Sequence, residues 1–245
     1  MRRLGLAAFV WAALAAPAAA YDITDPEVEK GQQKLEAISV GQQGFAAGST
    51  GNARNLQSLS YSYGLTDYWQ LKGGIAGDRL DDRGWEVTAL FAESVFEIVD
   101  VKKTGFGLGW FTAVAGAVND DATNVATFGP IIKFAHQHVS LTLNPFLEKT
   151  FGQNHEQGIA FAYGWQANME IKKGVILSLA GFGHIADIGG HTPTFEAQEH
   201  KIGPLIGFET EVAENRTLGL ELGVFFGLTD ATADTAVKAK LSYTY

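Results

Sequence analysis

The sequence contains no cysteine, so no disulfide can hold this 245-residue chain together. Small exported domains often depend on disulfides, and a closed, hydrogen-bonded β-barrel is another way to stabilise such a chain. Proline is also scarce, with six residues in the whole chain. No stretch after the first twenty residues offers ~18 consecutive apolar residues, which excludes a transmembrane helix.

Basic residues are fewer than acidic ones. The chain has 18 Lys and Arg against 27 Asp and Glu, which gives a formal net charge of -9. Nucleic-acid-binding proteins use basic surfaces to contact phosphates. The acidic balance therefore argues against nucleic acid as a partner.

The first twenty residues have the three parts of a secretory signal peptide. Residues 1–3 are a short basic start, residues 4–16 are apolar and rich in alanine, and residues 17–20 are small. This pattern predicts cleavage before Tyr21, which removes two arginines and changes the net charge from -9 to -11. Residues 21–31 are polar and without periodicity, and we interpret them as a periplasmic lead. Residues 32–245 form the predicted barrel domain.

The last strand-like segment shows the clearest two-residue period. Large or apolar residues alternate with polar ones up to the final residue. One face carries Val237, Ala239, Leu241, Tyr243 and Tyr245, and the other carries Lys238, Lys240, Ser242 and Thr244. A period of two over ~10 residues indicates a strand between two different environments.

Eleven further segments show the same alternation, so the sequence predicts twelve strands. Their approximate ranges are 33–45, 54–63, 68–78, 85–99, 105–118, 124–134, 139–149, 158–171, 175–186, 200–212, 217–228 and 233–245. In the fourth, Phe91 and Phe96 fall on opposite faces, which predicts a β-bulge near Glu93. Tight turns alternate with longer polar loops, as in membrane barrels.

The two faces of these strands decide between a soluble and a membrane barrel. A soluble barrel is apolar inside and polar outside. Here the face opposite the large apolar residues carries small and polar ones, which could not fill a twelve-stranded barrel as a dry core. We therefore predict an all-β protein, a transmembrane antiparallel up-and-down β-barrel of about 12 strands with a polar, water-filled lumen.

The C-terminus resembles the assembly signal of Gram-negative outer-membrane β-barrels. Leu241, Tyr243 and Tyr245 carry the resemblance, because that signal places aromatic and apolar residues at the last position and at alternate positions before it. The resemblance implies a bacterial outer-membrane location. It also implies outer-membrane lipid and the barrel-assembly machinery as partners.

Two short stretches carry a narrower resemblance. They are VEKG at residues 28–31 and YGLTDYW at residues 63–69. Both resemble segments of small transporter-like proteobacterial barrels, similar to those associated with the meta-pathway of phenol degradation. This group supplies no catalytic or binding residues that can be transferred to this chain.

Charged residues on the inward face are the candidate functional residues. By alternation the lumen-lining charges are Lys34, Glu36, Lys72, Lys133, Glu148, Glu170, Lys201, Glu209, Glu211, Glu221, Lys238 and Lys240. Lys238 and Lys240 could pair with Glu221 and, across the barrel seam, with Glu36. These ion pairs could serve only to neutralise the charges inside the barrel, or they could also line a path for solutes.

The loops opposite the tight turns carry an excess of acid. This outer acidic rim consists of Asp81, Asp82, Asp120, Asp121, Asp187, Asp230 and Asp234. Negative charge at a pore mouth raises the local cation concentration within ~10 Å at moderate salt. The sequence therefore predicts a mild preference for cations.

Other motifs give no catalytic or metal-binding residue. GFGLG at residues 105–109 lacks the spacing of a phosphate-binding loop and is better explained as small residues on an inward face. His155, His184, His191 and His200 lie in or near loops and could approach a metal ion, although solvated loop histidines explain them as well. We expect no cofactor.

The sequence favours a passive channel for small solutes. One alternative is a barrel with a plugged lumen and a structural or interaction role. Another is a lipid-facing outer-membrane enzyme. His138 and Ser140 are two residues apart, but the pattern places them beside a tight turn rather than in a catalytic arrangement.

Overall fold

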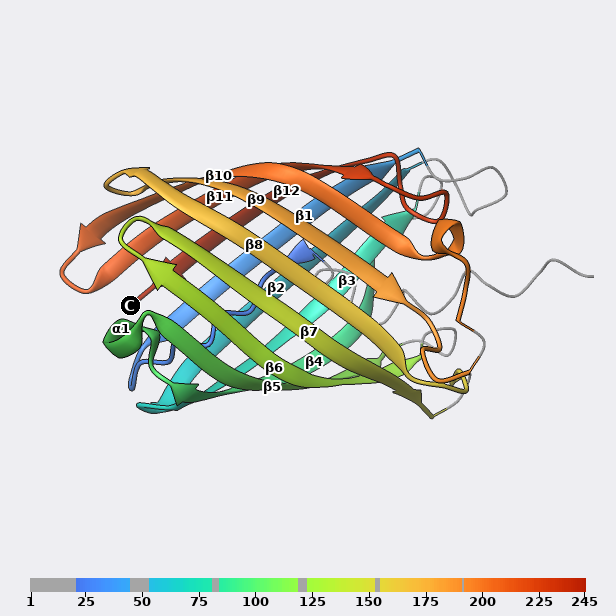
Figure 1. The fold of residues 1–245 in the computed structure, drawn as a ribbon, viewed down its shortest axis with the longest axis horizontal. Coiled ribbons are helices and arrows are strands. Elements are labelled where there is room, and N and C mark those ends of the chain that lie inside the picture. The colour runs from blue at the N-terminus through green and yellow to red at the C-terminus, as the bar shows by residue number, and fades with distance from the viewer. Residues whose placement is uncertain (1–20, 45–52, 81–83, 119–122, 153–154, 191) are drawn as a thin grey trace, which may run out of the picture.

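A computed structural model describes residues 21–44, 53–80, 84–118, 123–152, 155–190 and 192–245. These residues form a single closed sheet of twelve strands (Figure 1). The strands are β1 (Gln33–Gln43), β2 (Ala53–Thr66), β3 (Trp69–Leu80), β4 (Glu86–Val99), β5 (Phe106–Ala117), β6 (Asn124–His136), β7 (Val139–Phe151), β8 (Ala160–Lys172), β9 (Val175–Ile185), β10 (Glu199–Ala213), β11 (Arg216–Gly227) and β12 (Thr235–Thr244). The predicted fold class and strand number are confirmed.

Every strand pairs antiparallel with its neighbours in sequence, and β12 closes the barrel against β1. In this closing pair Leu35 lies opposite Tyr243. Gln33 and Tyr245 extend the pairing through two backbone hydrogen bonds of 2.8 and 2.9 Å. The C-terminal aromatic residues therefore hold one end of the seam.

Four of the connections at the turn end are two-residue turns, shorter than any connection at the loop end. The turn end carries the C-terminus and five short connections, of which one contains the single-turn helix α1 (Val101–Thr104). The loop end carries the longer connections, including the 3-10 turn η3 (Phe195–Ala197). No helix among the described residues has the length and apolar character needed to cross a membrane.

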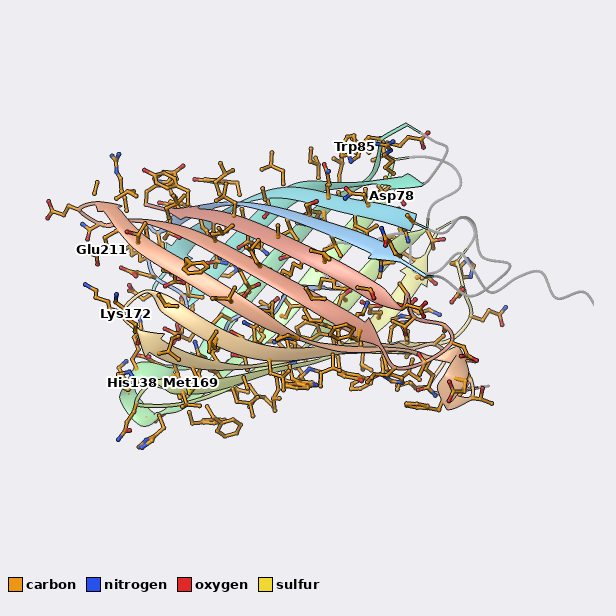
Figure 2. All side chains as sticks on the ribbon, turned by 90° about the horizontal axis from the view of Figure 1, so that it is seen from above. Asp78, Trp85, His138, Met169, Lys172 and Glu211 are labelled. Carbon is orange, nitrogen blue, oxygen red and sulfur yellow. The ribbon has the colours of Figure 1, made fainter. Side chains whose placement is uncertain are left out.

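Large apolar side chains cover the outside of the barrel (Figure 2). Leu179 is 44% exposed, Leu220 is 38% exposed and Leu241 is 50% exposed, although all three lie in the middle of strands. Water would oppose such a surface, whereas lipid favours it. The predicted outward orientation of the apolar face is confirmed.

The bulge in β4 lies earlier than the sequence predicts. The β3–β4 register shifts between Ala76 and Gly77, opposite residues 87–89, and not near Glu93. Phe91 consequently points inward, and its ring lies 2.5 Å from the position that a side chain on Gly74 would take. The predicted site was wrong because one extra residue reverses every later side chain, and the sequence shows only the net reversal.

The inner face is less uniformly polar than the sequence predicts. An apolar cluster inside the barrel contains Tyr21, Ile38, Val40, Leu56, Ala180, Phe182, Leu205, Phe225 and Ala236. A second one contains Val95, Phe111 and Ile131, with Val28 and Phe146 packed against it. Both clusters include residues that precede β1, so the lumen is partly filled by the chain itself.

The orientation of β8 gives a direct test with adjacent residues. Ala167 lies opposite Leu141 and Leu179 on the lipid-facing side. Gln166 faces the lumen, where its amide lies 3.3 Å from Glu221. We expect Ala167→Arg to lower the free energy of unfolding by ~2–4 kcal/mol, because it places a charge in lipid.

Gln166→Arg is the matched control, since it introduces the same side chain one residue away and next to a carboxylate. We expect a much smaller loss for this variant. Denaturant unfolding of both proteins in lipid vesicles measures the difference. Equal losses, or a larger loss for Gln166→Arg, would contradict the orientation.

Candidate functional site in the barrel lumen

The chain before β1 lies inside the barrel. Tyr21 is 1% exposed, and its ring contacts Phe225 and Phe182 with centroid distances of 5.6 and 6.1 Å. The Gln42 amide donates a hydrogen bond of 2.6 Å to the Tyr21 hydroxyl, and Lys201 Nζ lies 3.8 Å from the ring centroid. Residues 21–27, which we name the inner segment, are thus packed against the strands rather than forming a free periplasmic lead.

Inward-facing glycines leave space for the inner segment. A Cβ on Gly164 would lie 2.7 Å from Ile23 Cδ1, and one on Gly109 would lie 3.0 Å from Pro26 Cβ. These distances are shorter than ordinary van der Waals contacts. The glycines of the GFGLG stretch therefore serve packing.

The inner segment enters the lumen at the turn end, where the two stretches VEKG and YGLTDYW meet. Gly31 N donates to Gly64 O at 2.8 Å, and Gly64 N donates to Gln32 O at 2.9 Å. A Cβ on Gly64 would lie 2.0 Å from Glu29 O, so no side chain fits there. The two stretches thus form one structural unit that guides the chain into the barrel.

Ion pairs fix Asp22 against the closing strand. Lys240 Nζ lies 2.8 Å and Lys238 Nζ 3.2 Å from Asp22 Oδ1. The same two lysines reach Glu36 at 3.1 Å and Glu221 at 2.8 Å, respectively. One carboxylate of the inner segment therefore joins β1, β11 and β12 across the seam.

The network continues along β1, β3 and β4. Lys34 lies 2.6 Å from Glu36, and Lys72 lies 3.8 Å from Glu36 and 2.9 Å from Glu93. We name the whole set the lumen charge cluster: Asp22, Glu36, Glu93, Glu221, Lys34, Lys72, Lys238 and Lys240. Its four acids and four bases balance, so ionised groups can be held away from bulk water.

Asp22 is ionised in this setting. Burial by itself would raise the pKa of its carboxyl, but the ammonium groups of Lys240 and Lys238 outweigh it and hold that pKa below its usual range. The carboxylate therefore stabilises the folded state at pH values above the unfolded pKa of about 3.9. This contribution is lost only as the pH falls through the lowered pKa of the folded state.

A second set of contacts holds the inner segment against the opposite wall. Lys133 pairs with Asp25 at 2.6 Å and also with Glu27. The side chain of Asn144 accepts a hydrogen bond from Thr24 N at 2.8 Å and donates one to Thr24 O at 2.9 Å. The segment is therefore bound on both sides of the lumen.

Two cavities lie beside the inner segment. One, of about 190 Å³, opens toward the turn end and includes Gln32 and Gln70, and the other, of about 170 Å³, reaches His184 and Glu199 near the loop end. Both are lined by Asp22, Thr24, Glu36, Ser60, Lys72 and Glu93. These shared residues mark a charged constriction between the two cavities.

The twelve charges expected in the lumen separate into several groups. Six belong to the lumen charge cluster, Lys133 holds the inner segment, and Lys201 lies against Tyr21. Glu148 pairs with His184 at 3.2 Å near the loop end. Glu170 on β8 and Glu209 and Glu211 on β10 are exposed near the turn end and do not join the cluster.

Sequence reasoning missed several carboxylates that face the lumen or its mouth, among them Asp22, Asp25, Glu27, Asp78, Glu93 and Glu97. Glu93 was missed because the bulge was placed at it rather than before it. The structure places Glu93 directly opposite Lys72, which the alternation of β3 already assigns to the lumen. The acids of the inner segment carry no periodicity that could reveal their burial.

The outer acidic rim is described only in part. Asp81, Asp82, Asp120 and Asp121 lie outside the described residues. Asp187, Asp230 and Asp234 lie in connections at the loop end, as the sequence predicts. The selectivity inferred from this rim stays a prediction.

The described histidines do not gather into a metal site, and His191 lies outside the described residues. No group of three or more His, Cys, Asp or Glu residues suited to a metal ion occurs in the part of the chain that the structure describes. His200 hydrogen-bonds to the Tyr163 hydroxyl at 2.8 Å. His138 lies 3.6 Å from Glu170 at the turn end, and Ser140 instead accepts a bond from Asn168.

Comparison with solved structures identifies the architecture. An outer-membrane channel from Pseudomonas putida superposes with a TM-score of 0.62 and 13% identity over 91% of this chain and 98% of that one. This fold is that of an outer-membrane β-barrel. The NanC porin gives a TM-score of 0.55 with 7% identity over 86% and 98% of the two chains, and the KdgM porin gives 0.52 with 9% over 86% and 98%. No family model and no curated protein matches the sequence.

The ion pairs of Lys240 predict how firmly the inner segment is held. We expect Lys240→Met to expose the segment, because Asp22 and Glu36 lose a shared cation. The absence of native cysteine allows a Thr24→Cys reporter, whose labelling by a thiol reagent measures exposure. The labelling rate should rise roughly tenfold, since ~1.4 kcal/mol corresponds to a factor of ten. The effect stays moderate because Asp22 keeps its ion pair with Lys238, and Glu36 keeps those with Lys34 and Lys72.

Lys173→Met is the control for this experiment, because Lys173 is exposed in the turn between β8 and β9. It removes the same charge without touching the lumen charge cluster. An equal labelling rate in both variants would show that Lys240 does not hold the segment.

Proposed function

We propose that this protein is a passive outer-membrane channel for small solutes, with a path that runs beside its inner segment. The observation that supports this role is the charged constriction between the two cavities. Paired charges there keep the lumen wettable while leaving little net field. The superposition on outer-membrane channels and porins agrees with this proposal.

The lining of the path favours small solutes that carry both polar and apolar groups. Phe91, Phe111, Phe146 and Phe182 line the cavity toward the loop end, alongside Glu148 and His184. A cavity of about 170 Å³ suits small solutes. The inner segment also carries both an aromatic and a charged side chain, Tyr21 and Asp22.

A plugged barrel with a structural or interaction role is the second candidate. The burial of Tyr21 and the ion pairs of Asp22 favour it, because they fix the inner segment across the lumen. In that case the segment would remain bound and no solute path would open. The two candidates make opposite predictions for ion conductance.

The proposal also covers how the barrel is assembled in the membrane and which group of barrels it is related to. Leu241, Tyr243 and Tyr245 would serve as the signal for the barrel-assembly machinery, and their place at the seam agrees with that role. Kinship with barrels of the phenol meta-pathway group rests on the VEKG and YGLTDYW stretches. Their mutual contact gives both stretches a shared role in positioning the inner segment.

Planar-bilayer conductance distinguishes a channel from a plugged barrel. We expect a small conductance for the protein that begins at Tyr21. Deletion of residues 21–27 should raise it several-fold, because the segment occupies the lumen. A shift in gel mobility on boiling verifies that each sample is folded. A folded protein without conductance would contradict the channel and support the plugged barrel.

The outer acidic rim predicts the sign of selectivity. We expect a mild cation preference that strengthens at low salt, since an exposed rim acts within a Debye length of ~10 Å at 0.1 M. Reversal potentials across a salt gradient measure it. Replacing both Asp120 and Asp121 by Asn should weaken the preference without closing the pore. Anion selectivity of the unmodified protein would contradict the rim argument.

A further inference from the structure

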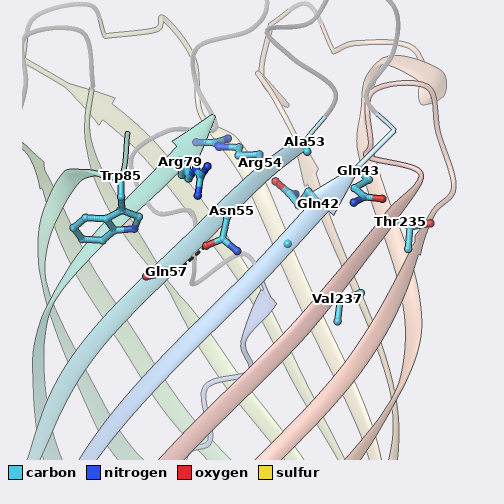
Figure 3. Close-up of a pocket in the computed structure, with 11 residues that line it drawn as sticks. Gln42, Gln43, Ala53, Arg54, Asn55, Gln57, Arg79, Trp85, Thr235 and Val237 are labelled. Atoms are coloured by element: carbon cyan, nitrogen blue, oxygen red, sulfur yellow. Dashed lines mark hydrogen bonds between the residues drawn. The ribbon is translucent and has the colours of Figure 1, made fainter. Parts of the chain in front are cut away.

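A groove of about 800 Å³ lies on the outer wall of the barrel at the loop end (Figure 3). Across β12, β1, β2 and β3, the residues Val237, Gly41, Asn55 and Arg79 lie side by side in one row. Their side-chain positions point outward, because Val237 is 55% exposed on the apolar face of β12. We name this feature the outer groove.

Two glycines account for the shape of the outer groove. A Cβ on Gly41 would have only one neighbouring atom, Asn55 Nδ2 at 4.0 Å, so this position is an open floor. A Cβ on Gly77 would lie 2.7 Å from Cζ2 of Trp85, so the indole covers Gly77 and forms a wall. Figure 3 shows Trp85 beside Arg79 at this wall.

The lining of the outer groove differs from the rest of the outer wall. Gln43, Asn55 and Gln57 present amides, and Gln57 donates a hydrogen bond of 2.9 Å to Asn55. No acidic residue is among the described residues that line the groove. Arg54 is neutralised by Asp78 at 2.5 Å, whereas no described carboxylate forms an ion pair with Arg79. A chain of net charge -9 thus has a positively charged groove on a lipid-facing wall.

The position of the groove matches the membrane interface. Arginine on the lipid face of a barrel costs ~2–4 kcal/mol at the bilayer midplane but only ~0–1 kcal/mol near the interface. Tryptophan is enriched at the same level. Farther from the loop end, Leu59 and Ile75 are exposed and apolar, as contact with acyl chains requires.

We propose that the outer groove binds a phosphate-bearing lipid headgroup of the outer leaflet. The guanidinium of Arg79 pairs with the phosphate, since its fork of N–H donors fits phosphate oxygens. The amides of Asn55 and Gln57 donate further hydrogen bonds. Trp85 packs beside the headgroup, and the acyl chains lie over Leu59 and Ile75.

Lipid titration followed by native mass spectrometry tests this site. The probes are bisphosphorylated lipid A, its dephosphorylated form and inorganic phosphate, each added to the purified protein in detergent. We expect the phosphorylated lipid to bind in preference to the other two. Arg79→Gln should weaken its binding about tenfold, the loss of one charge-assisted hydrogen bond.

Two more variants separate charge from shape. Gly41→Val fills the floor with a residue that suits a strand, and we expect it to weaken lipid binding while Arg79 is retained. Arg216→Gln removes an exposed arginine at the opposite end of the barrel, and we expect it to leave binding unchanged. The gel-mobility shift on boiling verifies the fold of each variant.

Three outcomes would overturn the proposal. The first is equal lipid binding by folded Arg79→Gln and by the unmodified protein. The second is binding of inorganic phosphate as tight as that of the lipid and equally dependent on Arg79, which would make the site one for free anions. The third is a dimer that dissociates in Arg79→Gln or Gly41→Val, which would assign the groove to a second copy of the chain.

Discussion

Closure of the backbone hydrogen-bond ladder is the constraint on which this structure depends. In lipid an unpaired backbone N–H or C=O costs several kcal/mol, so the last strand must pair with the first. The β1–β12 seam meets this need and leaves no sheet edge. Because β1 starts at the turn end, the chain before it must reach that end. The inner segment therefore runs through the lumen toward the turn end, and Gly31, with a φ of 80°, reverses the chain there so that it enters β1.

The lumen and the inner segment are complementary in shape and charge. Glycines on β5 and β8 receive Pro26 and Ile23, and lysines on β6 and β12 receive the carboxylates of the segment. Buried ion pairs contribute little net stability, because desolvation offsets the attraction. Their effect here is positional, since an unpaired Asp22 or Lys238 inside the barrel would be costly. The same contacts that fix the segment also line the constriction proposed as a solute path.

The sequence by itself determined the barrel. The two-residue period of segments such as 217–228 and 233–245 fixes which side chains face lipid, and a slip by one residue would turn them all inward. Loop lengths indicate which connections share an end of the barrel. The pattern of Leu241, Tyr243 and Tyr245 indicates the strand that closes it. These signals are local, so they can be read without knowing which strands meet. The inward position of Lys238 and Lys240 follows from the same alternation.

Only the tertiary structure decided what fills the lumen and what lies on the wall. Asp22 and Lys240 are separated by 218 positions, and no local pattern relates them. Glu93 became a partner of Lys72 only because a bulge earlier in β4 reversed its face. The outer groove likewise forms where Gly41, Asn55 and Arg79 from three strands meet. Contacts of this kind depend on the register between strands and on the closure of the barrel, which periodicity within a single strand does not specify.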